Sequence, residues 1–513
     1  MSDNIIKHLS FGDEARENVF NGIDKLYLAV SSTLGASGKC VLLEDGSGSP
    51  MVTKDGVTVA NAVTLIDPVE NMGATLLKQA ARKTVEEAGD GTTTATILAH
   101  SIISEAQKIK GFSEREIKAG INSATSKVIK YLEDRATEVS GDMLKHVATI
   151  SSNNDEELGE IISSAFNASG KGGVVTMEIS RDENTSFEVV NGATLDKPLK
   201  NFHFITDKDS GSCVLNNPLV LIVENKIENI RKIEPILAYV IKNNKELLII
   251  GDADEQVVSA LAMNKIKGNI KVNVVDAPDY GINRKERMQD LAVITGATVI
   301  NEDLGDDMDL IQPEHLGECS KAITNKEETI LEVDELNEEV KELVELVKSQ
   351  MEETKFPGKK LQLEKRLAIL SCKVSVIKVG ANSEVELKEK SDRVEDAICA
   401  TRAAIKEGIL PGGGVALLNA SKKVKAVNEV EESLLRAIRK PYEVIMTNGE
   451  YDEIIYDKRT GYGVDVKTGK TVNMIKAGII DPLLVTKSAL KNAVSVSTTI
   501  MSTNCVINNL RQK

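Results

Sequence analysis

A glycine- and threonine-rich segment at residues 89–94 has the strongest chemical signature in this sequence. It reads Gly-Asp-Gly-Thr-Thr-Thr, and the residues after it can continue as a helix. Two glycines allow a tight turn, and the hydroxyls add donors at a helix N-terminus, where the helix dipole favours an anion. Phosphate would fit there, with Asp90 beside it if Mg²⁺ lies between the two. A helix cap preceded by a turn explains the segment equally well.

Two further glycine turns could approach a phosphate, although neither is specific alone. Residues 33–38 read Thr-Leu-Gly-Ala-Ser-Gly, and residues 53–57 read Thr-Lys-Asp-Gly-Val. The first is a common turn composition, and the second is more often a hairpin. Cys40 stands where a Walker A loop needs Ser or Thr, and no Gly-x-Gly-x-x-Gly follows a strand. A nucleotide would therefore bind here without either common fingerprint.

The elements that would position these turns follow the order helical, mixed α/β, helical. A capping box at Ser113 and Glu116 predicts the start of an amphipathic helix. Short β-branched runs predict strands at 174–176, 219–223, 247–250 and 272–275. Residues 246–276 predict a parallel βαβ unit, and residues 336–370 predict a solvated helical hairpin. This order is typical of a middle domain inserted into a discontinuous helical domain.

Composition and charge disfavour several classes of function. The 513 residues suggest about three domains. With 63 Lys and Arg against 78 Asp and Glu, the net charge of −15 argues against nonspecific binding to nucleic acid or to an anionic membrane. We expect no secretory signal and no membrane-spanning segment. The six cysteines are scattered without a Cys-x-x-Cys pair, which favours a reducing compartment and predicts a cytoplasmic protein.

Taken in order, the motifs of this chain resemble those of one protein family. They lie at residues 33–35, 53–57, 70–74, 88–96, 393–397, 400–404 and 411–417. The last three read Arg-Val-Glu-Asp-Ala, Ala-Thr-Arg-Ala-Ala and Pro-Gly-Gly-Gly-Val-Ala-Leu. This series resembles the group I chaperonins, the GroEL/Hsp60 family, over nearly the whole chain. The protein is identified as a divergent member of that family.

The resemblance implies a multidomain α plus α/β fold of the GroEL type. A helical equatorial domain that binds ATP would comprise residues 1–136 and 408–513. A small intermediate hinge domain would comprise residues 137–190 and 373–407. An apical, substrate-binding α/β domain would be inserted at residues 191–372. The hinge segment 371–373 reads Ser-Cys-Lys where the family usually has a glycine pair, so we expect a stiffer or displaced hinge.

The resemblance also implies a set of nucleotide-site residues. Asp396 matches the carboxylate that positions the attacking water, and Asp55 matches a second catalytic carboxylate near it. The implied ligands are ATP, Mg²⁺ and K⁺, with Asp90 holding the Mg²⁺ and Lys54 near the K⁺. The residues expected to contact the nucleotide are Thr33, Leu34, Gly35, Lys54, Asp90, Gly91, Thr92, Thr93, Thr94, Gly413, Asp465 and Asp481.

By the same resemblance, an apolar apical face captures non-native polypeptides. The residues expected on it are Leu199, His203, Phe204, Leu237, Val258 and Met263. His203 replaces an expected aromatic residue and Glu234 an expected aliphatic one, which weakens the expected grip. Amphipathic helices of an ordinary α/β domain would give a similar pattern.

The implied function is an ATP-dependent chaperonin that promotes the folding of unfolded or misfolded polypeptides. The implied assembly is a homo-oligomer of seven-membered rings, two of them stacked, with a GroES-like co-chaperonin as a lid. One alternative is a divergent ring that holds clients with weak or uncoupled ATP cycling. Another is a nucleotide-dependent metabolic enzyme on the βαβ core, which lacks both a nucleotide fingerprint and a catalytic His or Cys constellation.

Overall fold

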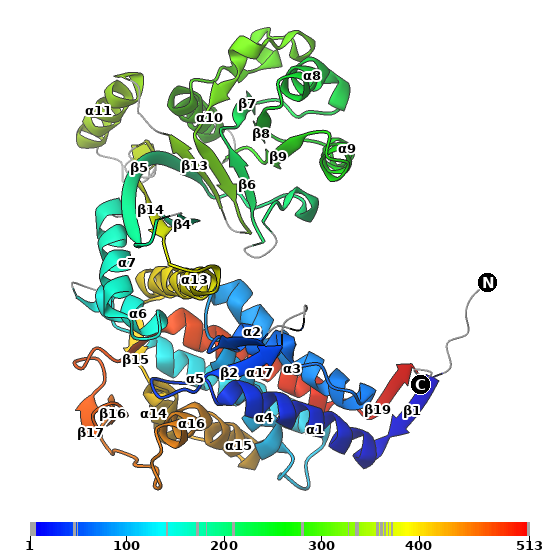
Figure 1. Cartoon of the computed structure of the whole chain (residues 1–513), viewed down its shortest axis with the longest axis vertical. Coiled ribbons are helices and arrows are strands. Elements are labelled where there is room, and N and C mark those ends of the chain that lie inside the picture. The colour runs from blue at the N-terminus through cyan, green and yellow to red at the C-terminus, as the bar shows by residue number, and fades with distance from the viewer. Residues whose placement is uncertain are drawn as a thin grey trace. The chain divides into compact units, whose positions relative to one another are not determined.

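The computed structural model divides the chain into two compact units (Figure 1). Unit 1 comprises Met1–Ser163, Arg181–Glu183 and Val379–Lys513, and unit 2 comprises Ser164–Ser180 and Asn184–Lys378. The described residues are 7–44, 48, 50–139, 142–170, 174–180, 182–207, 211–278, 282–326, 328–333, 338–354, 359, 363, 366–367, 369–370 and 373–509. Unit 2 is thus inserted into a discontinuous unit 1. An intermediate domain is not separated at this level, so the predicted boundaries of three domains remain a prediction.

Unit 1 is predominantly helical. Its helices are α1 (Gly12–Ser31), α2 (Gly56–Ala62), α3 (Pro68–Ala88), α4 (Thr92–Ala106), α5 (Glu114–Glu133), α6 (Met143–Ser151), α13 (Glu384–Glu407), α14 (Val415–Lys423), α15 (Glu429–Ala437), α16 (Lys440–Asn448) and α17 (Leu483–Met501), together with the start of α7 (Glu156–Ser169). α17 packs against α3 and α4, and α1 packs against α3, so their apolar faces form one core. Within the described residues, no helix is long and apolar enough to cross a membrane.

Local sequence signals explain where several of these helices begin. The predicted capping box of α5 is confirmed: Ser113 and Glu116 each accept a hydrogen bond from the other's backbone N–H. The N-terminus of α3 has Asp67 as its cap and Pro68 in its first turn, a position where the missing N–H of proline costs nothing.

Four antiparallel strand pairs complete unit 1. They are β1 (Lys7–Phe11) with β19 (Cys505–Asn509), β2 (Val41–Glu44) with β3 (Pro50–Thr53), β15 (Ile409–Pro411) with β18 (Ile480–Pro482), and β16 (Tyr462–Asp465) with β17 (Lys470–Asn473). The last three pairs end next to turns that carry predicted site residues.

Unit 2 is an α/β unit with two sheets. One sheet has the order β10 (Val299–Ile300), β7 (Leu219–Val223), β8 (Glu246–Ile250), β9 (Lys271–Val275), all parallel, with β11 (Gly317–Glu318) antiparallel to β7. The other has the order β4 (Val174–Ile179), β14 (Lys373–Val379), β5 (Ser186–Leu195), β13 (Thr329–Val333), β12 (Lys321–Thr324), β6 (Cys213–Asn216). Strand β7 is buried along its whole length, which explains its continuous apolar sequence.

The helices of unit 2 confirm the predicted βαβ unit. They include the end of α7, α8 (Glu234–Lys242), α9 (Glu255–Ile266), α10 (Ile282–Thr295) and α11 (Glu338–Glu353). α9 connects the parallel strands β8 and β9. α11 forms the first arm of the predicted helical hairpin, and Val340 and Val347 on it are fully buried. Most of the second arm lies outside the described residues, as do Ser371 and Cys372 of the predicted hinge.

Candidate functional site

One pocket in unit 1 contains every residue that the sequence assigned to catalysis or to the nucleotide. Its volume is about 370 Å³. The predicted residues that line it are Thr33, Leu34, Gly35, Lys54, Asp55, Asp90, Gly91, Thr92, Thr93, Thr94, Asp396, Gly413, Asp465 and Asp481. They come from short segments that are far apart in the chain, and the fold brings these segments together.

The segment 89–94 forms a tight turn between two helices, as its composition predicts. Gly89 ends α3 and Gly91 precedes α4, and both have left-handed backbone conformations, with φ of 70° and 95°. A side chain at Gly91 would be strained, and its Cβ would lie 2.8 Å from Val485 Cγ1. The turn places the unpaired N–H groups at the start of α4 on the pocket wall, where they suit an anion.

Two of the predicted carboxylates are engaged in local turns. Asp55 caps α2, because its two carboxylate oxygens accept the N–H groups of Val57 at 3.1 Å and Thr58 at 2.7 Å. Residue 55 therefore starts a helix, whereas the β2–β3 hairpin ends just before it. Asp465 accepts Lys467 N–H at 3.0 Å and the Thr468 hydroxyl at 2.7 Å in the β16–β17 turn. These hydrogen bonds leave both side chains little freedom to move at the pocket wall.

Three further carboxylates of the pocket, Asp90, Asp396 and Asp481, have raised pKa values. Burial raises the pKa of Asp90, and the charge of Asp55 adds to the effect. Burial raises the pKa of Asp396 well above its ordinary value, and the charges of Asp90 and Asp55 contribute further. The pKa of Asp481 is raised to about 7 by burial and by Asp90, against the hydrogen bonds from the Gly413 and Gly414 backbone. The pocket therefore concentrates negative charge that a cation would relieve.

These carboxylates fit Mg²⁺ only together with a phosphate. No three His, Cys, Asp or Glu side chains in the described part of the chain are grouped to hold a metal by themselves. Proteins usually bind Mg²⁺ through one or two carboxylates, and substrate phosphates and water supply the other ligands. The buried Asp90, adjacent to the anion-favouring start of α4, has the chemistry of such a ligand.

Several lining residues were missed by the sequence analysis. Asn153 and Asn154 follow α6 and have left-handed φ angles of 60° and 63°. Arg393 lies on α13, one turn before Asp396, and forms an ion pair with Glu389. Two adjacent asparagines suggest a turn, but nothing in their spacing indicates a ligand.

The expected apolar face of unit 2 differs from the observed one. Phe204 is fully buried and Val258 is 5% exposed, so both belong to the core instead of the surface. Phe202, two residues earlier in the same short 3₁₀ turn, is 70% exposed. A turn of three residues points neighbouring aromatic side chains in different directions, and the sequence pattern does not show which one faces inward.

The remaining residues of that prediction are at least partly accessible. Met263 on α9 is 52% exposed, and His203 is also exposed and lies against the Phe202 ring at a centroid distance of 3.9 Å. Leu199 and Leu237 are half-buried against the core. Glu234 is exposed at the first position of α8.

Comparison with known proteins identifies the class. The sequence matches the TCP-1/cpn60 chaperonin family over residues 26–511, so the chain belongs to this family. Its fold is similar to that of the chaperonin gp146 from the bacteriophage EL 2 (Pseudomonas aeruginosa), crystallised in the presence of ATP-BeFx. In crystal form II the TM-score is 0.71 at 23% identity, with 100% of both chains covered. In crystal form I it is 0.65 at 23% identity, with 98% and 99% covered.

The expected family and fold class are therefore confirmed. The family match covers most of the chain, and the structural similarity extends over both units. Family membership supports a chaperone function for this protein.

Proposed function

We propose that this protein is an ATP-dependent chaperonin that captures non-native polypeptides and promotes their folding through ATP binding and hydrolysis. The observation that carries the proposal is the pocket of unit 1 described above. It gathers the turn at residues 89–94, two further glycine turns and several aspartates in a chain of the chaperonin family. A structural role alone gives no reason for so many like charges to share one cavity.

The pocket residues have chemistry suited to a nucleoside triphosphate. The first N–H groups of α4 and the turn at residues 33–35 would hold the phosphates. Asp90 would hold Mg²⁺, which supplies positive charge to the phosphates when bound. Lys54 would add a further positive charge near a K⁺ site. Gly413 and Asp465 would contact the nucleoside, and Asp481 the ribose.

Asp396 is the carboxylate that we assign to the attacking water, with Asp55 as a second carboxylate near it. Phosphoryl transfer to water depends on positioning and electrostatics more than on a strong base. Asp396 lies on the rigid helix α13, and Asp55 is fixed by its capping bonds. Burial and the neighbouring aspartates raise the pKa of Asp396, and a bound cation would oppose that repulsion and favour its ionised form.

Client capture would use the exposed apolar side chains of unit 2. Phe202 and Met263 are the exposed ones near the predicted face, and Leu199 and Leu237 would add to the surface if the neighbouring side chains shift. Burial of apolar surface contributes about 25 cal/mol per Å². Because these few side chains offer a small apolar area, one copy of the chain would bind a client weakly. Seven-membered rings, two of them stacked, would multiply these contacts, and a GroES-like lid would displace the client. The division into equatorial, intermediate and apical domains belongs to this proposal.

A metabolic enzyme on the α/β core of unit 2 is disfavoured by the structure. In such folds, ligands bind at the carboxyl ends of parallel strands where the strand order reverses, here between β7 and β10. Asn301 Nδ2 donates to Glu224 Oε2 at 2.5 Å there, and the Glu302 N–H donates to Asn225 Oδ1 at 2.8 Å. These polar groups are therefore already engaged with one another.

Steady-state ATP turnover, combined with a client assay, tests the proposal on the full-length protein. We expect Mg²⁺-dependent turnover, capture of a denatured client, and release of the client on addition of ATP. Capture without ATP turnover would favour the ring that only holds clients. Absence of both capture and nucleotide binding would refute the proposal. Images of negatively stained particles with and without ATP would test the seven-membered rings.

A further inference from the structure

Helix α16 lies against two of the glycine turns that line the pocket. Its last residue, Asn448, donates from Nδ2 to the carbonyl oxygens of Ser31 and Leu34, each at 2.9 Å. A Cβ built on Gly35 would lie 3.1 Å from Ile445 Cγ1 of the same helix. These contacts fix the turn that follows α1 against α16.

The other end of α16 contacts the turn at residues 412–414. A Cβ on Gly414 would lie 2.7 Å from the backbone nitrogen of Tyr442 and would also be strained, because the φ of Gly414 is 75°. Tyr442 is almost fully buried, and its hydroxyl donates to Ile455 O at 2.6 Å. α16 therefore forms a rigid support whose two ends hold two separate segments of the pocket wall.

We propose that Asn448 is a positioning residue for the nucleotide site, acting through the turn at residues 31–35. This inference depends on the proposed function. A primary amide has two hydrogens, and Asn448 gives one to each of two carbonyls that flank Thr33 in sequence. Thr33, Leu34 and Gly35 line the pocket, whereas Asn448 stands behind the turn and is not among the described residues on the pocket wall.

Hydrogen bonds within the turn define its shape. The Leu34 N–H reaches Ser31 O at 3.2 Å, the Gly38 N–H reaches Gly35 O at 2.9 Å, and the Lys39 N–H reaches Ser32 O at 2.8 Å. Thr33 also donates to Val30 O, from its N–H at 3.1 Å and from Oγ1 at 2.9 Å. The amide of Asn448 attaches this turn to α16, so its position beside the pocket is set before the nucleotide arrives. Loss of that attachment weakens nucleotide binding, because binding must then order the turn. Turnover at saturating ATP changes little, because Asp396 lies on another helix.

A series of variants at position 448 tests this role. Asn448→Ala removes both donors, Asn448→Ser can restore one, and Asn448→Asp places a carboxylate against two carbonyl oxygens. Thr447→Ala is the matched control, because Thr447 is the preceding residue of α16 and is exposed. We expect KM for MgATP to rise about ten-fold in Asn448→Ala, the order expected for one or two lost hydrogen bonds. The rise should be smaller in Asn448→Ser, larger in Asn448→Asp, and absent in Thr447→Ala.

A merely structural role would give a different pattern. The inference requires that kcat at saturating MgATP and the melting temperature without nucleotide change little in Asn448→Ser and Asn448→Ala, while the melting shift produced by MgATP shrinks. It is overturned if KM stays at the wild-type value in Asn448→Ala, or if stability falls without any change in the MgATP-induced shift. If wild type itself shows no response to MgATP, the proposed function fails and the inference fails with it.

Discussion

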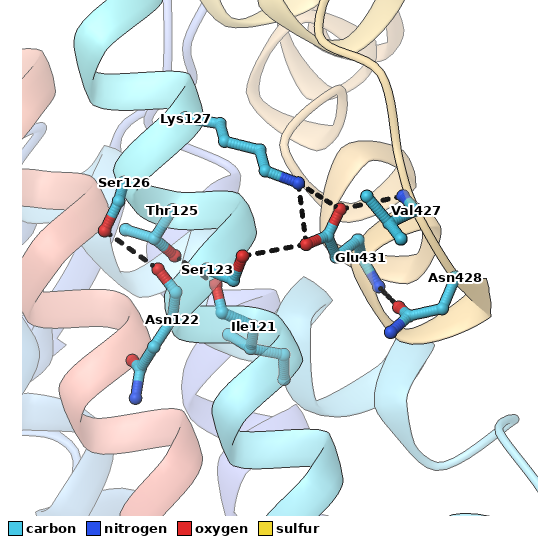
Figure 2. A network of polar contacts seen from close by, with 9 residues as sticks. All are labelled: Ile121, Asn122, Ser123, Thr125, Ser126, Lys127, Val427, Asn428 and Glu431. Atoms are coloured by element: carbon cyan, nitrogen blue, oxygen red, sulfur yellow. Dashed lines mark hydrogen bonds and ion pairs between the residues drawn. The ribbon is translucent and has the colours of Figure 1, made fainter.

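Two groups of carboxylates in unit 1 have opposite electrostatic surroundings. Glu431 on α15 is 4% exposed and accepts hydrogen bonds from three groups (Figure 2). The donors are Lys127 Nζ at 2.6 and 2.8 Å, Ser123 Oγ at 2.8 Å and the Val427 N–H at 2.8 Å. Burial acts to raise the pKa of Glu431, but these bonds outweigh it and hold the pKa below its ordinary value. This carboxylate is stabilised as an ion by groups that the protein itself supplies.

Asp90, Asp396 and Asp481 in the pocket are not compensated to this extent, because their pKa values stay raised. For Asp396 the largest influences on the pKa are burial and two other aspartates, all of which disfavour its charge. Asp90 and Asp481 have raised pKa values for similar reasons. The contrast shows how to separate the roles of buried acids in this chain. A carboxylate such as Glu431, whose hydrogen-bond donors come from the protein, holds two helices together. Carboxylates that repel one another in a cavity form a site that needs a cation from solution.

The largest expected effect comes from replacing Asp396, the pocket carboxylate that we assign to the attacking water. Asp396→Asn keeps the size of the side chain but removes the charge that would orient water. We expect ATP turnover to fall about 10²- to 10⁴-fold, the usual range for a positioned acid or base, with MgATP binding retained. Steady-state turnover and the MgATP-induced melting shift measure the two quantities separately.

Glu384→Gln provides the control for this substitution. Glu384 is the first residue of α13, is exposed, and is not among the described residues that line the pocket. Turnover should therefore stay within about two-fold of wild type, since exposed charges have small effects. Turnover by Asp396→Asn close to that of wild type would contradict the assignment of this carboxylate.

A second substitution would remove the ion pair of Glu431, so that the electrostatic surroundings of Glu431 become more like those of Asp396. Lys127→Met removes the cation that faces Glu431 but keeps the length of the side chain. Breaking a buried ion pair costs about 3–5 kcal/mol, and we expect a smaller cost of about 2–3 kcal/mol here because Lys127 is partly exposed. For a unit of this size the melting temperature should fall by about 5 °C.

The pH dependence of Lys127→Met sharpens this comparison. Without its cation Glu431 should bind a proton more readily, so the deficit at pH 7 should shrink as the pH is lowered toward 5. Lys130→Met, an exposed position on the same helix, should change the melting temperature by little. Equal melting temperatures for the two variants would show that Glu431 does not depend on its cation.

Much of the fold could be predicted because its signals are local. The capping box at Ser113, the β-branched run of β7 and the turn at residues 89–94 each depend on a few adjacent residues. The pocket residues were assigned through the resemblance of the ordered motifs to the chaperonin family, since turn composition alone left the turns at residues 33–38 and 53–57 unspecific. The side of a short turn that faces inward depends on the rest of the fold, which is why Phe204 was expected at the surface where Phe202 is exposed.

Residues that reach the site by long-range packing could not be predicted. Asn153, Asn154 and Arg393 line the pocket through the packing of α6 and α13, and Asn448 supports it from behind. The three asparagines belong to no motif of the sequence, and Arg393 stands in the 393–397 motif, from which only Asp396 was assigned to the site. Their roles depend on tertiary contacts, for which a single sequence contains no direct signal.

The smallest expected effect concerns Asp481, whose pKa of about 7 lies well above the ordinary value of 3.8. A raised pKa means that the folded protein binds this proton more tightly than the unfolded chain does. The associated stability is fully present below about pH 4 and is lost as the pH rises through 7. Asp481→Asn imitates the protonated form at every pH, so it avoids this loss.

Melting temperatures of the nucleotide-free protein between pH 5 and 8 would test this prediction. The Asp481→Asn variant should melt above wild type at pH 8, by about 2 °C, and the gap should narrow toward pH 5. Asp457→Asn is the matched control, because Arg459 lowers the pKa of Asp457 to about 2 and the residue stays ionised throughout. Its gap to wild type should be constant over this range and of the opposite sign. A difference in melting temperature between Asp481→Asn and wild type that does not change with pH would show that the pocket carboxylates do not repel one another. The contrast between Glu431, which is stabilised as an ion by the protein itself, and the pocket aspartates, which need a cation, would then fail.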